Sequence, residues 1–232
     1  MMLHKSFITN IEIYSPAWDA FRIGKFTSSR ISTLMPEKGL GDGGMSYIYQ
    51  KASEYLIGQT LAEEEAIIED ENTVWGLENE LRALQTFCRI QKIEYLVMQR
   101  LIHVPGTIFS STPDALHVID SSVFKEDCYN VATVEVKCPR KFPRFLELYR
   151  CNTPMDIWKV ERKYFWQVVD QMFNCQSVLG YLGIYHPLFP EGKNMKIIEF
   201  NKIDLWDKFK LLEERKAKAV SIFNEIVSEF RS

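Results

Sequence analysis

The sequence predicts a mixed α/β (α+β) fold with a central mixed sheet flanked by helices. Segments of helical period come first, strand-like segments fill residues 93 to 136, and a helix, two strands and a last helix follow. This order does not have the regular strand–helix alternation of βαβ winding. The chain of 232 residues is 46% apolar and has no Gly/Ser-rich linker, so a single domain over residues 1–232 is expected.

The first half predicts two helices after a glycine-rich loop. Residues 37–46 are expected to form the loop, which lacks the Gly-Lys-Ser/Thr of a phosphate loop. Residues 46–58 predict a short helix that ends at Gly58. Residues 72–90 predict a second helix with Asn72 or Thr73 as its N-cap, and its apolar stripe comprises Leu77, Leu81, Leu84 and Cys88.

Strand-like alternation marks residues 93–104, 107–112, 115–120 and 131–137, with a polar stretch at 121–130. Residues 155–179 predict a helix, and 181–186 and 195–200 predict two more strands. Residues 205–230 form a long amphipathic pattern. Because Lys216 and Ala219 interrupt its apolar stripe, we expect this helix to pack on the chain's own sheet rather than in a coiled coil.

Composition argues against a membrane protein or a secreted one. There is no apolar run long enough to span a bilayer or to act as a signal peptide. The five cysteines are odd in number and contain no Cys-x-x-Cys pair, which favours reduced thiols. We therefore expect a soluble cytoplasmic protein.

The net charge of 28 − 31 = −3 does not by itself favour a nucleic-acid partner, but the charges are unevenly distributed. Residues 61–71 hold six acids and no base, whereas residues 137–163 hold eight bases against three acids. The basic segment is either a solvated face or a phosphate-binding one. If it binds DNA, the expected backbone contacts are Arg140, Lys141 and Arg144.

Acidic and basic residues in two predicted strands suggest chemistry. In the strand 131–137, Glu135 and Lys137 share one face while Val134 and Val136 occupy the other. Asp114, after a turn-forming proline, would bring a second carboxylate beside Glu135 if the strands are neighbours. Two close carboxylates favour a hard divalent cation, and a nearby lysine then suits phosphodiester cleavage. The alternative is a cross-strand ion pair with Asp114 in an ordinary turn.

"TPDAL" followed by "VEVKCP" resembles the signature of PD-(D/E)xK nucleases, and in particular the lambda exonuclease (YqaJ-like viral recombinase) family. This resemblance implies a restriction-endonuclease-like core and a Mg²⁺ cofactor, with Mn²⁺ as a substitute. It assigns metal binding to Asp114, Glu135 and the carbonyl of Val136. It assigns to Lys137 the activation of water.

Two earlier segments match the same family in order. "FRIGKFTSSR" resembles its 5′-phosphate motif, so Arg22 and Ser29, with Thr27 and Ser28 beside them, are the implied phosphate-binding residues. "WGLENE" resembles its Trp-Gly helix, whose final glutamate supports the metal, here Glu80. The helical period agrees, since it places Glu80 on the apolar side of its helix, where an unpaired carboxylate is unfavourable.

"YFWQVVDQMF" resembles the family's glutamine-bearing helix that lines the active site. Gln167 is the implied catalytic glutamine, although Gln171 shares its stripe and the choice between the two stays open. A structural amide is the competing interpretation.

The resemblance implies a Mg²⁺-dependent 5′–3′ exonuclease acting on linear double-stranded DNA with a 5′-phosphorylated end, which leaves a 3′ single strand for recombination. It also implies a homotrimer and a single-strand annealing protein as partner. If the source is a virus or phage, the expected location is the host cytosol. Alternatives are a PD-(D/E)xK endonuclease or a non-catalytic DNA-binding protein that retains the fold.

Overall fold

A computed structural model describes residues 7–9, 11–13, 15–61, 71–94, 96–103, 106–119 and 130–231. Most of the acidic run at 61–71 and of the polar stretch at 121–130 lies outside these residues. The N-terminal half contains β1 Phe7–Ile8, α1 Pro16–Arg22, β2 Phe26–Thr27, the 3-10 helix η1 Ser28–Leu34, α2 Gly41–Ile57, α3 Glu71–Gln91, β3 Val97–Met98, β4 Ile102–His103, β5 Phe109–Ser111 and β6 Ala115–Val118. The second half contains β7 Val131–Lys137, α4 Phe142–Tyr149, α5 Pro154–Val160, α6 Arg162–Cys175, β8 Leu179–Tyr185, β9 Met195–Asn201 and α7 Trp206–Arg231.

The described strands form two sheets. The larger has the order β3-β6-β7-β8-β9 and is mixed, because β7 and β8 are parallel while the other pairs are antiparallel. The smaller has the order β1-β4-β5-β2. The predicted strand at 93–104 is therefore divided, since β3 joins the larger sheet and β4 the smaller one. The predicted fold class, a mixed sheet flanked by helices, is confirmed.

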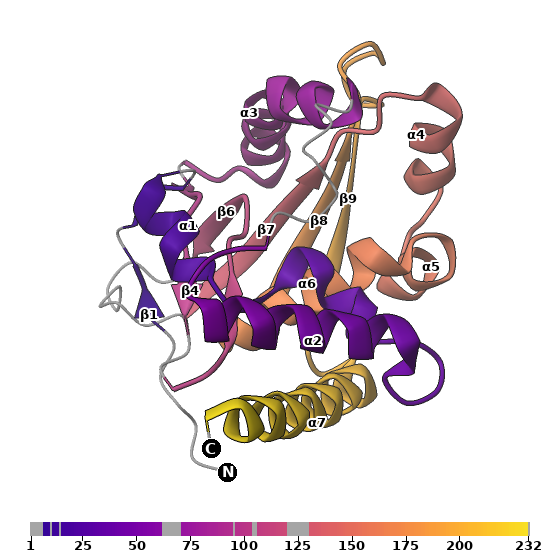
Figure 1. The fold of residues 1–232 in the computed structure, drawn as a ribbon. Helices are drawn as coiled ribbons and strands as arrows, with labels where there is room; N and C mark the ends of the chain where they lie inside the picture. The colour runs from indigo at the N-terminus through magenta and orange to yellow at the C-terminus, as the bar shows by residue number, and fades with distance from the viewer. Residues whose placement is uncertain are drawn as a thin grey trace.

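The larger sheet is covered by different helices on its two faces (Figure 1). Val134 and Val136 of β7 pack with Leu84 and Phe87 of α3 in one apolar cluster. The opposite face of β7 meets α6, which donates hydrogen bonds to Glu135. The predicted alternation of faces along β7 is therefore confirmed, and the charged face is the one that α6 covers.

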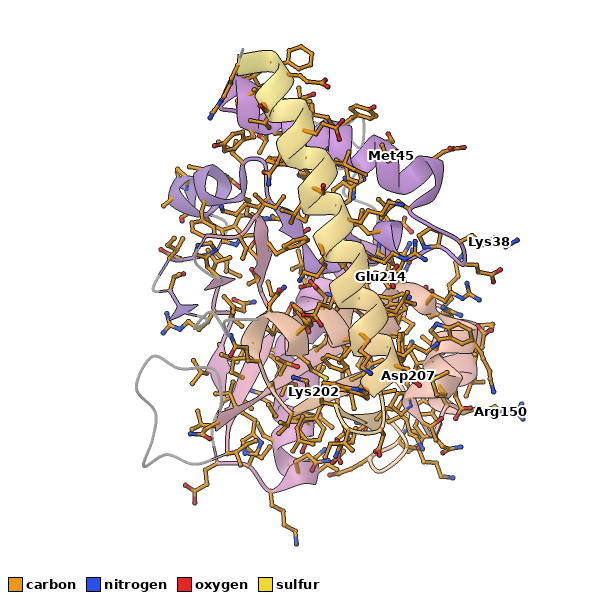
Figure 2. The ribbon with its side chains drawn as sticks, turned by 90° about the horizontal axis from the view of Figure 1, so that it is seen from below. Lys38, Met45, Arg150, Lys202, Asp207 and Glu214 are labelled. Atoms are coloured by element: carbon orange, nitrogen blue, oxygen red, sulfur yellow. The ribbon has the colours of Figure 1, made fainter. Side chains whose placement is uncertain are left out.

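The long C-terminal helix α7 lies beside α2 and also contacts α6 and η1 (Figure 1). Seen from below, α7 crosses the molecule with Asp207 near its start and Glu214 further along (Figure 2). Its apolar stripe is buried within this chain, as predicted. It packs on α2, α6 and η1, and also on Phe26 of β2 and Phe109 of β5 in the smaller sheet. No helix in the described part of the chain is both long and apolar enough to cross a bilayer.

Several predicted helix boundaries were wrong. Helix α2 does end at Gly58, whose φ of 70° is left-handed, but it begins at Gly41 within the predicted loop. Helix α3 begins at Glu71, so Asn72 lies inside it rather than at its cap. The predicted helix 155–179 is two helices, separated at Glu161, whose side chain accepts a hydrogen bond from the backbone of Lys163.

Candidate active site

The pairing of β6 with β7 brings Asp114 beside Glu135. Ala115 is opposite Val134 in this antiparallel pair, so Asp114, one residue earlier, lies at the level of Glu135. The Asp114 carboxylate accepts a 2.7 Å hydrogen bond from the backbone N–H of Val136. This bond takes the place of a ladder bond at the end of β6 and fixes the carboxylate against β7.

Glu135 lies beneath α6 and is only 2% exposed. Its Oε1 accepts hydrogen bonds from the Lys137 ammonium at 2.5 Å and from the side-chain amide of Gln167. Its Oε2 accepts a 2.6 Å bond from the amide of Gln171. Both candidate glutamines therefore contact the same carboxylate, one on each oxygen, because residues four apart lie on the same side of a helix.

Glu80 reaches the same region from α3, the helix that packs on the opposite face of β7 from α6. It lines the same two cavities as Asp114, and its Oε1 accepts a 2.8 Å hydrogen bond from the side chain of Gln99. Gln99 in turn donates its backbone N–H to the carbonyl of Asp114 and has a left-handed φ of 44°. An unusual backbone conformation at such a position is common in functional sites.

Two of these carboxyl groups, Asp114 and Glu80, have raised pKa values. Burial raises the pKa of Asp114 well above its ordinary value of 3.8, and the charges of Glu135 and Glu80 add to the effect. Burial also raises the pKa of Glu80 above 4.5, with a further contribution from Glu135. The unpaired negative form of Asp114 and of Glu80 is therefore disfavoured in the absence of a further positive charge.

Lys137 is the cation that faces these carboxylates. Burial acts to lower its pKa, but the charges of Glu135 and Asp114 outweigh burial and raise the pKa above 10.5. A raised pKa keeps the ammonium protonated at neutral pH. In this arrangement Lys137 is suited to orient water or to balance charge, not to accept a proton.

The residues present fit a hard divalent cation. Mg²⁺ takes oxygen ligands and is usually bound through one or two carboxylates. Asp114, Glu80 and Glu135 supply carboxylates here. The N–H and C=O of one residue in an antiparallel pair point to the same neighbour. The carbonyl of Val136 therefore points to the side of Asp114, where β6 has ended.

The carboxylates are not already arranged as a ligand set. Among the described residues, no group of three His, Cys, Asp or Glu side chains is close enough to hold a metal ion. Glu135 instead uses both oxygens for hydrogen bonds to Lys137, Gln167 and Gln171. An ionised carboxylate has about four lone-pair sites. These three hydrogen bonds therefore leave Oε2 of Glu135 able to bind a cation while both glutamines keep the carboxylate oriented.

Two cavities meet at the carboxylates. The first has a volume of about 300 Å³, and the second about 430 Å³. Glu80 and Asp114 line both of them. A substrate that occupies both cavities would therefore pass directly over the carboxylates.

The first cavity contains the candidate phosphate-binding residues Arg22, Thr27, Ser28 and Ser29. The guanidinium of Arg22 stacks on the ring of Trp18 at 4.0 Å. The hydroxyls of Thr27 and Ser29 are 3.2 Å apart. A cation and two hydroxyls on one wall form an environment that suits a phosphate.

Ser28 differs from its neighbours. Its side chain is 3% exposed, and its hydroxyl donates a 2.6 Å hydrogen bond to Asp170. That hydroxyl proton is directed away from the cavity. The structure therefore gives Ser28 a different role from the phosphate contact that the resemblance implied.

The three basic candidates line the second cavity. Arg140 forms an ion pair with Glu71, and Arg144 forms ion pairs with Glu147 and Glu161. Lys141 precedes α4 and is exposed. These ion pairs involve exposed or half-exposed side chains, which a phosphate backbone can displace.

The sequence did not reveal three residues that the structure adds. Gln99 contacts Glu80, Trp18 stacks on Arg22, and Tyr164 lies with its ring 5.3 Å from the Lys137 ammonium. Gln99 was hidden within a strand-like run. The four-residue spacing of Trp18 and Arg22 was the one available signal.

Comparisons with solved structures identify this architecture. LHK-Exo, an alkaline exonuclease from Laribacter hongkongensis, is 17% identical, with a TM-score of 0.68 over 94% of this chain and 96% of its own. The chain has the fold of an exonuclease. A structure of LHK-Exo in complex with dAMP gives the same values.

A phage-related exonuclease from Haemophilus somnus 129PT is 14% identical, with a TM-score of 0.62 over 89% of this chain and 96% of its own. No protein-family model matches the sequence, and neither does any curated protein. The exonuclease fold is therefore established by structure, and it agrees with the restriction-endonuclease-like core that the sequence implied.

Proposed function

We propose that the protein is a Mg²⁺-dependent 5′–3′ exonuclease. It degrades linear double-stranded DNA from a 5′-phosphorylated end and leaves a 3′ single strand for recombination. One observation supports this most strongly: Glu80, Asp114, Glu135 and Lys137 converge beside a cavity that carries Arg22, Thr27 and Ser29. The exonuclease fold supports the same reaction class.

Asp114, Glu135, Glu80 and the Val136 carbonyl would hold the Mg²⁺, or Mn²⁺ in its place. The ion would supply polarisation of a phosphoryl oxygen and a lower pKa for a bound water. Lys137, protonated, would balance the negative charge that develops on the phosphate. The amides of Gln167 and Gln171 would orient Glu135.

The first cavity would bind the terminal phosphate through Arg22, Thr27 and Ser29. Arg140, Lys141 and Arg144 would contact the backbone along the second cavity. A cavity of about 300 Å³ is of the size that holds a small molecule rather than a long strand. LHK-Exo binds dAMP, and a mononucleotide is accordingly the product that we expect.

The partners in this proposal are double-stranded DNA, a single-strand annealing protein that takes up the 3′ strand, and further copies of the chain in a homotrimer. Light scattering of the purified protein would measure the oligomer. A monomer at working concentration would contradict the trimer but not the exonuclease.

The test uses labelled linear duplexes with a 5′-phosphate or a 5′-hydroxyl, and a covalently closed circle, with Mg²⁺ or with EDTA. Wild type should degrade the phosphorylated duplex faster and leave the circle intact. Glu135→Ala should yield no product, whereas Glu199→Ala, an exposed carboxylate of the same sheet, should behave as wild type. Cleavage of the circle would favour an endonuclease, and equal activity of Glu135→Ala would reject the site.

A further inference from the structure

A cluster of buried polar side chains lies behind the first cavity. It contains Ser28 of η1, Ser111 of β5, Asp170 and Asn174 of α6, and Lys216 of α7, and we call it the buried polar network. All five are between 0% and 5% exposed. Lys216 forms an ion pair of 2.6 Å with Asp170 and donates a 2.7 Å hydrogen bond to Oδ1 of the Asn174 side chain.

The geometry of the network determines where the hydroxyl protons of its two serines point. Asp170 accepts hydrogen bonds from Lys216, from the Ser28 hydroxyl and from the Asn174 amide. Because Ser28 gives its one proton to Asp170, the 2.7 Å contact between Ser28 and Ser111 must have Ser111 as donor. Neither serine has a proton left for a phosphate.

A buried charge pair is a costly way to stabilise a helix contact. Apolar side chains of similar volume often serve as well, whereas loss of one partner leaves an unpaired buried charge. Lys216 sits between the rings of Phe109 and Phe173, at 4.1 and 4.6 Å, in surroundings where an apolar residue would fit. The pair therefore calls for an explanation other than packing.

Three of the four segments that the network joins, η1, β5 and α6, carry or adjoin residues of the candidate site. Ser28 lies between Thr27 and Ser29 on the wall of the first cavity. Ser111 precedes the turn that presents Asp114. Asp170 lies on α6 between Gln167 and Gln171, which hold Glu135. One cluster thus connects the phosphate wall, the loop of Asp114 and the glutamine helix to α7.

We propose that Lys216 and Asp170 are positioning residues, which act through Ser28 to hold Thr27 and Ser29 in place for a 5′-phosphate. This inference rests on the proposed function. It assigns Ser28 to the framework of the phosphate cavity, and it makes α7 part of the machinery that recognises the DNA end.

The main variant is the double substitution Lys216→Met with Asp170→Asn, which removes both charges at similar volume. Ser28→Ala, a smaller change, tests the same link. The matched control is Lys218→Met, because Lys218 is exposed on the same helix. Circular dichroism and thermal unfolding would verify that each variant is folded.

Two readouts are needed. In kinetics, the double variant and Ser28→Ala should raise KM for the 5′-phosphorylated duplex by about ten- to a hundred-fold, with a much smaller change in kcat. Their preference for phosphate over hydroxyl ends should fall accordingly. In hydrogen exchange, backbone amides of residues 26–34 should exchange faster than in Lys218→Met, whether or not DNA is cleaved.

A folded double variant with the KM, the end preference and the exchange of Lys218→Met would overturn the proposal. If the double variant does not fold, Ser28→Ala decides by the same comparison. A wild type that cleaves no DNA would reject the proposed function, while the exchange experiment would still test the link from Lys216 to residues 26–34.

Discussion

The carboxylate of Asp114 accepts a 2.7 Å hydrogen bond from the backbone N–H of Val136. Through this bond, the backbone of β7 fixes the orientation of the Asp114 side chain, which belongs to the loop before β6. It also lowers the pKa of Asp114, but burial and the neighbouring carboxylates outweigh it, and the net shift is upward. The Asp114 carboxylate is therefore held in a fixed orientation, but its surroundings disfavour its negative charge.

The first prediction concerns the stability of the metal-free protein. A group with a raised pKa in the folded state contributes stability below its ordinary pKa, here 3.8, and that contribution is lost as pH rises through the folded value. In EDTA at neutral pH, Asp114→Asn should therefore be more stable than wild type, by on the order of 1 kcal/mol. Denaturant unfolding at several pH values would measure this, and the difference should shrink toward acid pH.

The same pair of proteins tests the cation. Saturating Mg²⁺ should raise the melting temperature of wild type, because a ligand at a hundred times its Kd stabilises by about 2.7 kcal/mol. Asp114→Asn should show little response, while Asp204→Asn, an exposed control, should respond as wild type. An equal Mg²⁺ response in Asp114→Asn would place the cation elsewhere.

The second prediction concerns the two glutamines of α6. Each donates to a different oxygen of Glu135, so Gln167→Ala and Gln171→Ala should each weaken Mg²⁺ binding by about ten- to a hundred-fold. Calorimetric titration of Mg²⁺ into each variant would measure the affinity. If only one variant is impaired, the other glutamine is a structural amide, as the sequence left open.

The third prediction concerns Gln99, whose side chain orients Glu80. Gln99→Gly should relieve the left-handed backbone, whereas Gln99→Ala should keep it, and both should lose the hydrogen bond to Glu80. Both variants should therefore bind Mg²⁺ more weakly, and the glycine variant should be the more stable of the two. Equal Mg²⁺ affinity in wild type and both variants would show that Gln99 does not orient Glu80.

The fourth prediction concerns Gly24, in the turn that follows Arg22. It has a φ of 65°, and a Cβ there would lie 2.7 Å from the Cβ of Tyr55. Gly24→Ala should lower the free energy of unfolding by about 2–5 kcal/mol. Gly76→Ala, inside α3, is the control, because a Cβ there would meet no described atom within 4 Å. This variant should raise the free energy of unfolding by roughly 0.5–1 kcal/mol.

The chemistry of the site was more predictable than its surroundings. Alternation along β7 was enough to place Glu135 and Lys137 on one face, because the period of a strand is independent of the rest of the fold. The stripe of α3 was predicted less well: Leu84 is buried, but Leu77 and Leu81 are 53% and 58% exposed. The contact of α3 with the sheet is made further along, by Ala83, Leu84 and Phe87.

The remaining differences between the predicted and the observed structure come from contacts between residues far apart in the sequence. No local pattern around Ser28 indicates that its hydroxyl bonds to Asp170, because the partner lies on another helix. Likewise, Lys216 looked like an interruption of an apolar stripe, and only the packing of α7 on α6 provides a carboxylate for it. Sequence motifs and the periods of helix and strand identified the candidate site residues. Contacts between distant segments determine which of their hydroxyls and amides are still able to bind a substrate.

The parallel pairing of β7 with β8 has a consequence for biosynthesis. The two strands are neighbours in the sheet, yet α4, α5 and α6 lie between them in the chain. Contacts so distant in sequence form slowly, after the intervening helices exist. A growing polypeptide on the ribosome therefore cannot pair β7 with β8, or bring Gln167 and Gln171 to Glu135, until residues 162–185 have been synthesised.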